Sequence, residues 1–167
     1  MTLRSKAMVA GFLGGILGAF AMDQFTRVWK TIVPDSKQTE QPPLPYSQQE
    51  WDSTSRTACR VAEPMLGRPL TTPEKALGAQ VVHFAAGGVA GAAYATGIAR
   101  RYWNPITSGV IFGAALWLVG EELAMPLLGI NDPPSAYSCS MHLNSLGEHL
   151  AYGVTTALVS KGLTAIL

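Results

Sequence analysis

Residues 106–130 decide the fold of this chain, and they read ITSGVIFGAALWLVGEELAMPLLGI. Almost all of these residues are apolar or small, and an apolar run of this length can cross a lipid bilayer. The exceptions are two adjacent carboxylates, Glu121 and Glu122. A carboxylate inside a membrane-spanning helix is costly unless it faces protein, water or a partner ion. The stretch therefore predicts a membrane protein that contains a buried acidic site.

The composition of the whole chain agrees with a membrane protein of one domain. Of its 167 residues, 48% are hydrophobic and only 14% are charged, whereas soluble domains typically have about 25% charged residues. The formal net charge of +1, with no basic tract, argues against a nucleic-acid partner. The two cysteines form no Cys-x-x-Cys pair, so the sequence does not indicate a cysteine metal site.

Four apolar segments predict an all-α, up-down bundle of four transmembrane helices. The predicted spans are residues 7–28, 73–99, 106–130 and 142–163, with a long polar loop over about 30–72. Glycines one helical turn apart occur in the first span, at Gly11 and Gly15 and again at Gly14 and Gly18. Small residues at this spacing let helices approach closely. Such faces also predict packing on partner membrane proteins or a second copy of the chain.

Two helix starts are predicted in and after the polar loop. Ser47 followed by Glu50 fits a capping box, so a weakly amphipathic helix is expected to run to about Glu63 at the membrane surface. Farther along, Thr71 supplies a capping hydroxyl and Pro73 stands in the first turn, which predicts the start of the second span.

The distribution of basic residues predicts that both termini lie in the cytoplasm. Short segments at the terminal side contain Arg4, Lys6, the pair at 100–101 and Lys161, and positive charge in short segments favours the cytoplasm. Cys59 and Cys139 would then lie outside, where a disulfide can persist. The alternative is that these two thiols are unpaired.

Ionisable side chains from all four spans are expected near one level of the bilayer, on the side of the long loop. This predicted polar cluster consists of Asp23, His83, Glu121, Glu122, Glu148 and His149. The acids and histidines would either pair to fix helix register or relay protons or ions. A third possibility is a metal or haem site with His83, His149 and Glu121 as ligands.

The adjacent glutamates are expected to face different directions, because neighbours on an α-helix are about 100° apart. We expect Glu121 to face the bundle interior, on the same face as Trp117 one turn earlier. Glu122 would then face a neighbouring helix or the headgroups.

Four segments resemble the YagU-like family of uncharacterised bacterial inner-membrane proteins. They are AMD at 21–23, VVHFAAGGVAGAAY at 81–94, SGVIFGAALWLVGEELAMPLLGI at 108–130 and HLNSLGEHLAYGV at 142–154. The resemblance implies a small multi-pass inner-membrane protein and supplies no reaction, substrate or cofactor. It places recurring polar positions at Asp23, His83, Glu121, Glu122, His142 and His149. The family pattern accepts aspartate as readily as glutamate at the position of Glu121.

The leading functional hypothesis from the sequence is a proton- or ion-linked membrane protein that supports envelope or pH homeostasis. No nucleophile–base pair, phosphate loop or dinucleotide fingerprint occurs, so enzymatic activity is not predicted. One alternative is a non-catalytic accessory subunit of a larger membrane complex. The other is a metal- or haem-binding redox component, for which the sequence selects no particular cofactor.

Overall fold

The computed structural model describes residues 2–33, 53–99 and 104–167, and the regular structure in these ranges is helical. The α-helices are α1 (Leu3–Ile32), α2 (Ser53–Leu66), α3 (Thr72–Ala93), α4 (Pro105–Leu116), α5 (Met125–Leu127) and α6 (Cys139–Ile166). The π-helical segments are η2 (Tyr94–Ile98) and η3 (Trp117–Ala124), and a 3-10 turn is η4 (Pro134–Ala136). The predicted all-α class is therefore confirmed.

Three helical stretches are long and apolar enough to cross a membrane. They are Leu3–Ile32, Thr72–Gly97 and Pro105–Leu127. Helix α6 has 28 residues but is not among them, because its first half contains polar residues such as Asn144, Glu148 and His149. The structure thus supports a helical protein with three apolar helices of membrane-spanning length.

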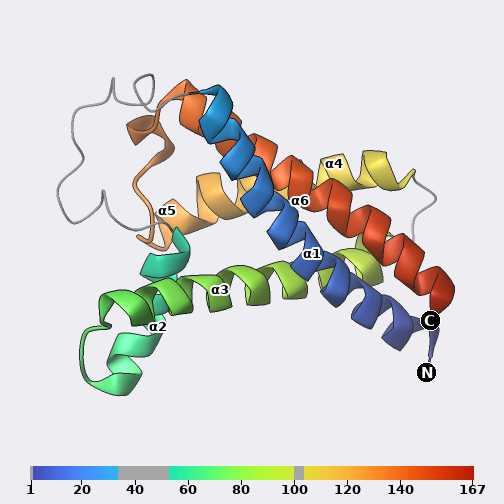
Figure 1. The fold of residues 1–167 in the computed structure, drawn as a ribbon, viewed down its shortest axis with the longest axis horizontal. Helices are drawn as coiled ribbons and strands as arrows, with labels where there is room; N and C mark the ends of the chain where they lie inside the picture. The colour runs from blue at the N-terminus through green and yellow to red at the C-terminus, as the bar shows by residue number, and fades with distance from the viewer. Residues whose placement is uncertain (1, 34–52, 100–103) are drawn as a thin grey trace.

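The long helices pack in the order α3, α1, α6, α4, and Tyr94 of η2, which continues α3, also contacts Ser108 and Phe112 of α4. Helix α1 packs against both α3 and α6, and α4 packs mainly against α6. Neighbouring helices run in opposite directions, so the N- and C-termini lie at one end and α2 and α5 at the other (Figure 1). Helices α3 and α4 therefore stand at the two ends of this order.

Glycines allow this close packing of the helices. The backbones of Gly11 and Gly15 in α1 touch those of Gly87 and Gly91 in α3, and a methyl group at Gly15 would overlap the Gly87 carbonyl. The glycine spacing in α1 therefore serves contacts inside the chain. The second glycine pair of α1 contacts α6, through Gly14, Gly18, Thr156 and Ser160. A third set of glycines joins α4 to α6, through Gly109, Gly113 and Gly153.

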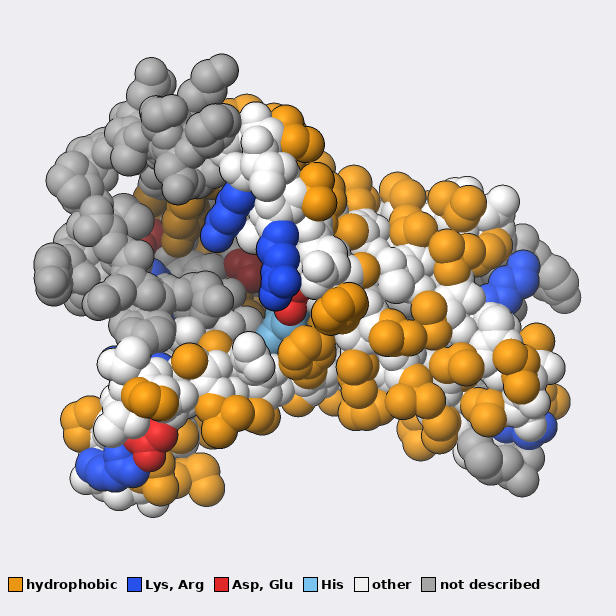
Figure 2. All heavy atoms as spheres, viewed as in Figure 1, with side chains coloured by type: hydrophobic (Ala, Val, Ile, Leu, Met, Phe, Trp, Pro, Cys, Tyr) orange, Lys and Arg blue, Asp and Glu red, His pale blue; other side chains and the backbone are white. Residues whose placement is uncertain are grey.

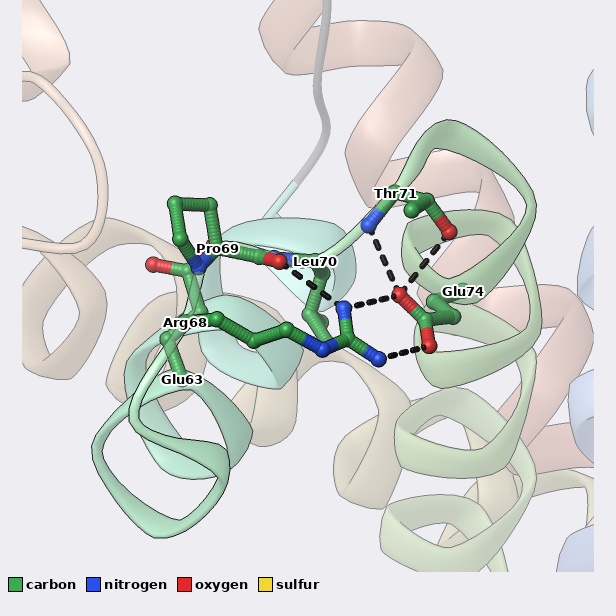
Figure 3. A network of polar contacts seen from close by, with 6 residues as sticks. All are labelled: Glu63, Arg68, Pro69, Leu70, Thr71 and Glu74. Carbon is green, nitrogen blue, oxygen red and sulfur yellow. Dashed lines mark hydrogen bonds and ion pairs between the residues drawn. The ribbon is translucent and has the colours of Figure 1, made fainter.

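The predicted start of the second span is confirmed at Thr71 and Glu74 (Figure 3). Glu74 Oε2 accepts hydrogen bonds from the backbone N–H and the hydroxyl of Thr71, both at 2.8 Å. Arg68 forms a two-pronged ion pair with Glu74, at 2.6 and 2.9 Å, and this pairing raises the pKa of the Arg68 guanidinium. Glu63 accepts from the N–H of Leu70 at 3.0 Å. The tight turn between α2 and α3 is thereby held on both sides.

Helix α2 packs on α3, and its position at the membrane surface stays a prediction. Its buried residues are Ser55 and Ala58, and Ala58 lies opposite Gly78 of α3. The predicted capping box at Ser47 and Glu50 lies outside the described residues. Helix α2 ends at Gly67, which has a φ of +66°, a left-handed conformation that glycine adopts without strain.

Candidate functional site

The two adjacent glutamates lie on a π-helical segment, η3, which joins α4 to α5 in one continuous helix. Its wider turn is shown by the Met125 N–H, which donates to the carbonyl of Gly120. Short π-helical segments inside α-helices are frequent at functional sites. Because the turn is wider, the α-helical spacing that placed Glu121 on the same face as Trp117 does not apply here.

Both glutamates border one cavity of about 240 Å³ at the end of the molecule opposite the termini. This acidic cavity lies between α1, η3, α6 and the segment from Asn131 to Tyr137. Three carboxylates line it, those of Glu121, Glu122 and Asp132, and none of the described lysines or arginines does so. Figure 2 shows acidic, histidine and basic side chains close together beside α1. The site is therefore suited to protons or cations.

Glu122 pairs with His142, which is the closest acid–histidine contact among the described residues. The carboxylate Oε1 lies 2.7 Å from Nδ1 of His142, and Nε2 of the same ring donates to the Pro134 carbonyl at 3.0 Å. Their side chains are 14% and 27% exposed. This histidine was identified from the sequence only through the family resemblance, because nothing in its local spacing indicates its partner.

Several buried polar atoms at the acidic cavity have no partner among the described residues. They are Nε1 of Trp29, Oδ2 of Asp132 and Oδ1 of Asn144. The backbone N–H of Asp132 donates to the hydroxyl oxygen of Tyr137 at 3.2 Å. Burial raises the pKa of that hydroxyl, so it remains protonated at neutral pH. Because buried polar atoms are usually satisfied, these groups favour an occupant that both donates and accepts.

A second cavity, of about 310 Å³, brings together three of the predicted site residues. His83, Glu121 and His149 all border it, with mostly small and apolar side chains between them. We call it the apolar cavity. Glu121 borders both cavities, with Oε1 accepting from Ser53 at 3.2 Å and Oε2 from Asn131 at 3.0 Å. Its carboxylate therefore separates the apolar cavity from the acidic one.

The predicted metal set of His83, His149 and Glu121 is not assembled as a ligand group. Nε2 of His83 donates to the Ala19 carbonyl at 3.2 Å and lies 3.3 Å from Asp23. Nδ1 of His149 donates to the carbonyl of Ser145 at 2.8 Å. In the described ranges, no three His, Cys, Asp or Glu side chains are placed to hold a metal ion. Each predicted ligand instead hydrogen bonds to its own neighbours.

The remaining predicted residues form separate contacts rather than one polar cluster. Glu148 accepts from the Thr26 hydroxyl at 2.6 Å and from the Asn144 amide at 2.7 Å, which ties α1 to α6. Asp23 pairs with His83 between α1 and α3. The expected common polar centre is thus divided into separate contacts, and Asp23 and Glu148 border neither of the two cavities.

The predicted disulfide between Cys59 and Cys139 is not formed, and both thiols are free. Cys59 lies on α2, beside Glu63 and Lys75, whereas Cys139 is the exposed first residue of α6. Burial and the nearby Glu63 raise the pKa of the Cys59 thiol.

No protein-family model, curated protein or solved structure matches this chain.

Proposed function

We propose that this chain is a proton- or cation-linked inner-membrane protein with four spans, related to the YagU-like family. The acidic cavity would be its functional centre, and envelope or pH homeostasis its role. The observation that carries this proposal is the Glu122–His142 pair, set beside Glu121 and Asp132 in a cavity that no described lysine or arginine lines.

The hydrogen bonds of His142 require a bound proton at this pair. The Pro134 carbonyl can only accept, so Nε2 of His142 carries a hydrogen. The 2.7 Å contact between Nδ1 and Glu122 needs a second hydrogen, carried by the ring as imidazolium or by the carboxyl group. The pair therefore holds one proton more than a neutral imidazole and a separate carboxylate. A group of this kind suits a proton relay.

We propose α6 as the fourth span, because its polar residues are sheltered by neighbouring helices. Helix α6 packs between α1 and α4, and its buried residues include Tyr152, Thr156 and Ser160. An inner helix needs less apolar surface than one that faces lipid. Large hydrophobic side chains are exposed on α1, α3, α4 and η3, as on lipid-facing helices, and α6 also exposes Leu143, Leu158 and Ile166. Examples on the other four elements are Leu13, Leu17, Val81, Val89, Ile111 and Leu118.

Thiol labelling tests the proposed orientation, with both termini in the cytoplasm. In intact cells we expect a membrane-impermeant maleimide to label Cys139 first, because it is exposed. In a Cys139→Ser variant, Cys59 should react more slowly, because its raised pKa leaves less reactive thiolate at neutral pH. Its rate should increase as the pH rises. Labelling of either thiol only after the cells are opened would reverse the orientation.

Proton flux into proteoliposomes, followed with an entrapped pH-sensitive dye, tests the function. We expect flux to fall about tenfold or more in Glu122→Gln and in Glu121→Gln, because a positioned proton-transferring group is lost. His83→Ala should show whether the Asp23 pair belongs to the same path. Glu63→Gln is the matched control, because this substitution removes the same negative charge at a position outside both cavities. Unchanged flux in all three cavity variants would disprove the proposal.

The accessory-subunit alternative was based on free glycine faces, and most of these faces are used inside the chain. Gly11, Gly15, Gly87 and Gly91 contact one another, so they do not offer a groove to another helix. A partner or a second copy of the chain would have to bind elsewhere, on the exposed apolar sides of α3 and α4. No contact described here favours a redox component.

A further inference from the structure

We propose that the apolar cavity binds an amphiphilic primary amine, with its ammonium group on Glu121 and its hydrocarbon chain between α3 and η3. This binding site goes beyond the proposed proton function, since it requires no proton movement. The argument rests on the size and lining of the cavity, the charge of Glu121 and the position of the opening.

The size and lining of the cavity fit a small amphiphile. Its volume of about 310 Å³ lies at the lower end of the range for small-molecule sites, about 300–1,000 Å³. The apolar part of its wall includes Met22, Val82, Leu116 and Met125. The polar part consists of hydroxyls of α2, two histidines, the Tyr152 side chain and the Glu121 carboxylate. One apolar end and one polar end are the features that an alkylamine matches.

Glu121 gives the polar end its charge. Among the described residues its carboxylate accepts from the neutral donors Ser53 and Asn131 and takes part in no ion pair. Ser53 is the first residue of α2, and the N-terminus of a helix stabilises an anion. Within the part of the chain that the structure describes, neither lysine nor arginine borders the cavity. A partly buried carboxylate that has no cationic partner among the described residues favours a cationic ligand.

The histidines favour an ammonium group with hydrogens over a quaternary one. Because Nδ1 of His149 donates to the Ser145 carbonyl, the neutral ring has its acceptor lone pair at Nε2. His83 donates through Nε2, so the lone pair of its neutral ring is at Nδ1. A primary ammonium has hydrogens to donate to such acceptors and to Glu121, whereas a trimethylammonium has none.

The position of the cavity suggests that its ligand enters from the bilayer. It is bordered by α3 on one side and η3 on the other, and beside the cavity α3 packs mainly on α1 and α2 rather than on α4 or η3. Exposed apolar side chains, including Val81 and Val119, lie on the outer surfaces of these two elements. An amphiphile dissolved in the membrane can therefore reach the cavity through this side.

Calorimetry on the full chain in lipid nanodiscs, with empty nanodiscs subtracted, tests the site. The probe is hexylammonium, and its controls are methylammonium, 1-hexanol and hexyltrimethylammonium. We expect hexylammonium to bind at least about tenfold more tightly than each control, because only it supplies the charge, the N–H donors and the chain. Equal binding of 1-hexanol or of methylammonium would overturn the proposal, and equal binding of hexyltrimethylammonium would overturn the donor requirement.

Two variants test the charged part and the apolar part of the site separately. Glu121→Gln should weaken hexylammonium binding at least about tenfold, and Glu63→Gln should not change it. Ala86→Leu narrows the cavity from an exposed position on its wall, so it should weaken hexylammonium binding without changing proton flux. Unchanged binding in Ala86→Leu, with the variant folded as judged by circular dichroism, would overturn the proposal even if Glu121→Gln fails to fold. If a variant lost proton flux but still bound hexylammonium, the loss would concern the proton path and not the amine site.

Discussion

Alanine at Gly153 is expected to destabilise the protein by about 1–3 kcal/mol, the usual cost of forcing extra atoms into a packed core. Gly153 lies on α6, where its backbone touches Gly109 and Gly113 of α4. A methyl group there would overlap the backbone of α4, which cannot move aside as a flexible side chain can. Unfolding in detergent, followed by circular dichroism at increasing denaturant, measures the loss.

Gly162 provides the matched control on the same helix. A methyl group at Gly162 meets nothing within 4 Å, so Gly162→Ala should be neutral or stabilising by up to about 1 kcal/mol, the helix-propensity difference between glycine and alanine. The difference between the two variants therefore measures interhelical packing. Equal effects at both positions would show that α4 and α6 do not pack as described.

Removal of the imidazole in His142→Ala is expected to destabilise the fold by about 2–3 kcal/mol, somewhat less than for a fully buried pair because the site is partly hydrated. The substitution leaves the Glu122 carboxylate, whose side chain is 14% exposed, without its partner. It also removes the donor to the Pro134 carbonyl, which holds the segment before α6 against this helix. The same unfolding measurement applies.

A double-mutant cycle with Glu122→Gln isolates the interaction between the two side chains. Glutamine carries no charge, so the double variant Glu122→Gln/His142→Ala should be more stable than the sum of the single effects predicts. If the effects of the two substitutions on stability were strictly additive, the unpaired Glu122 carboxylate would not be the cause of the destabilisation in His142→Ala. Thr26→Val removes the 2.6 Å hydrogen bond from the Thr26 hydroxyl to Glu148. Its loss of stability can be compared with that of His142→Ala, because Thr26 is a neutral donor.

Much of the helical structure could be predicted from local features of the sequence. Apolar runs marked the three long apolar helices, and the capping residues at Thr71 and Glu74 located the start of α3 to within a residue. The glycine spacing in α1 correctly indicated close helix contacts. These features can be predicted from the sequence because helix formation and capping depend on residues within a few positions of one another.

The candidate site was predicted less completely, because its contacts join residues far apart in the chain. Glu122 and His142 are 20 positions apart, and Thr26 and Glu148 are 122 apart. Asn131 and Asp132 are not among the predicted site residues, yet they border the acidic cavity. The π-helical turn at Glu121 was also missed, since the sequence was read with α-helical spacing throughout.

The sequence by itself determined that the chain is helical, that three of its helices are apolar enough to span a membrane, and that acids and histidines lie toward one end of them. Burial of apolar surface and hydrogen bonding within each helix suffice for this. Only the tertiary structure decided which acid meets which histidine. The order α3, α1, α6, α4 follows from where glycines permit close contact, and the polar residues form separate contacts, with Glu121 bordering both cavities.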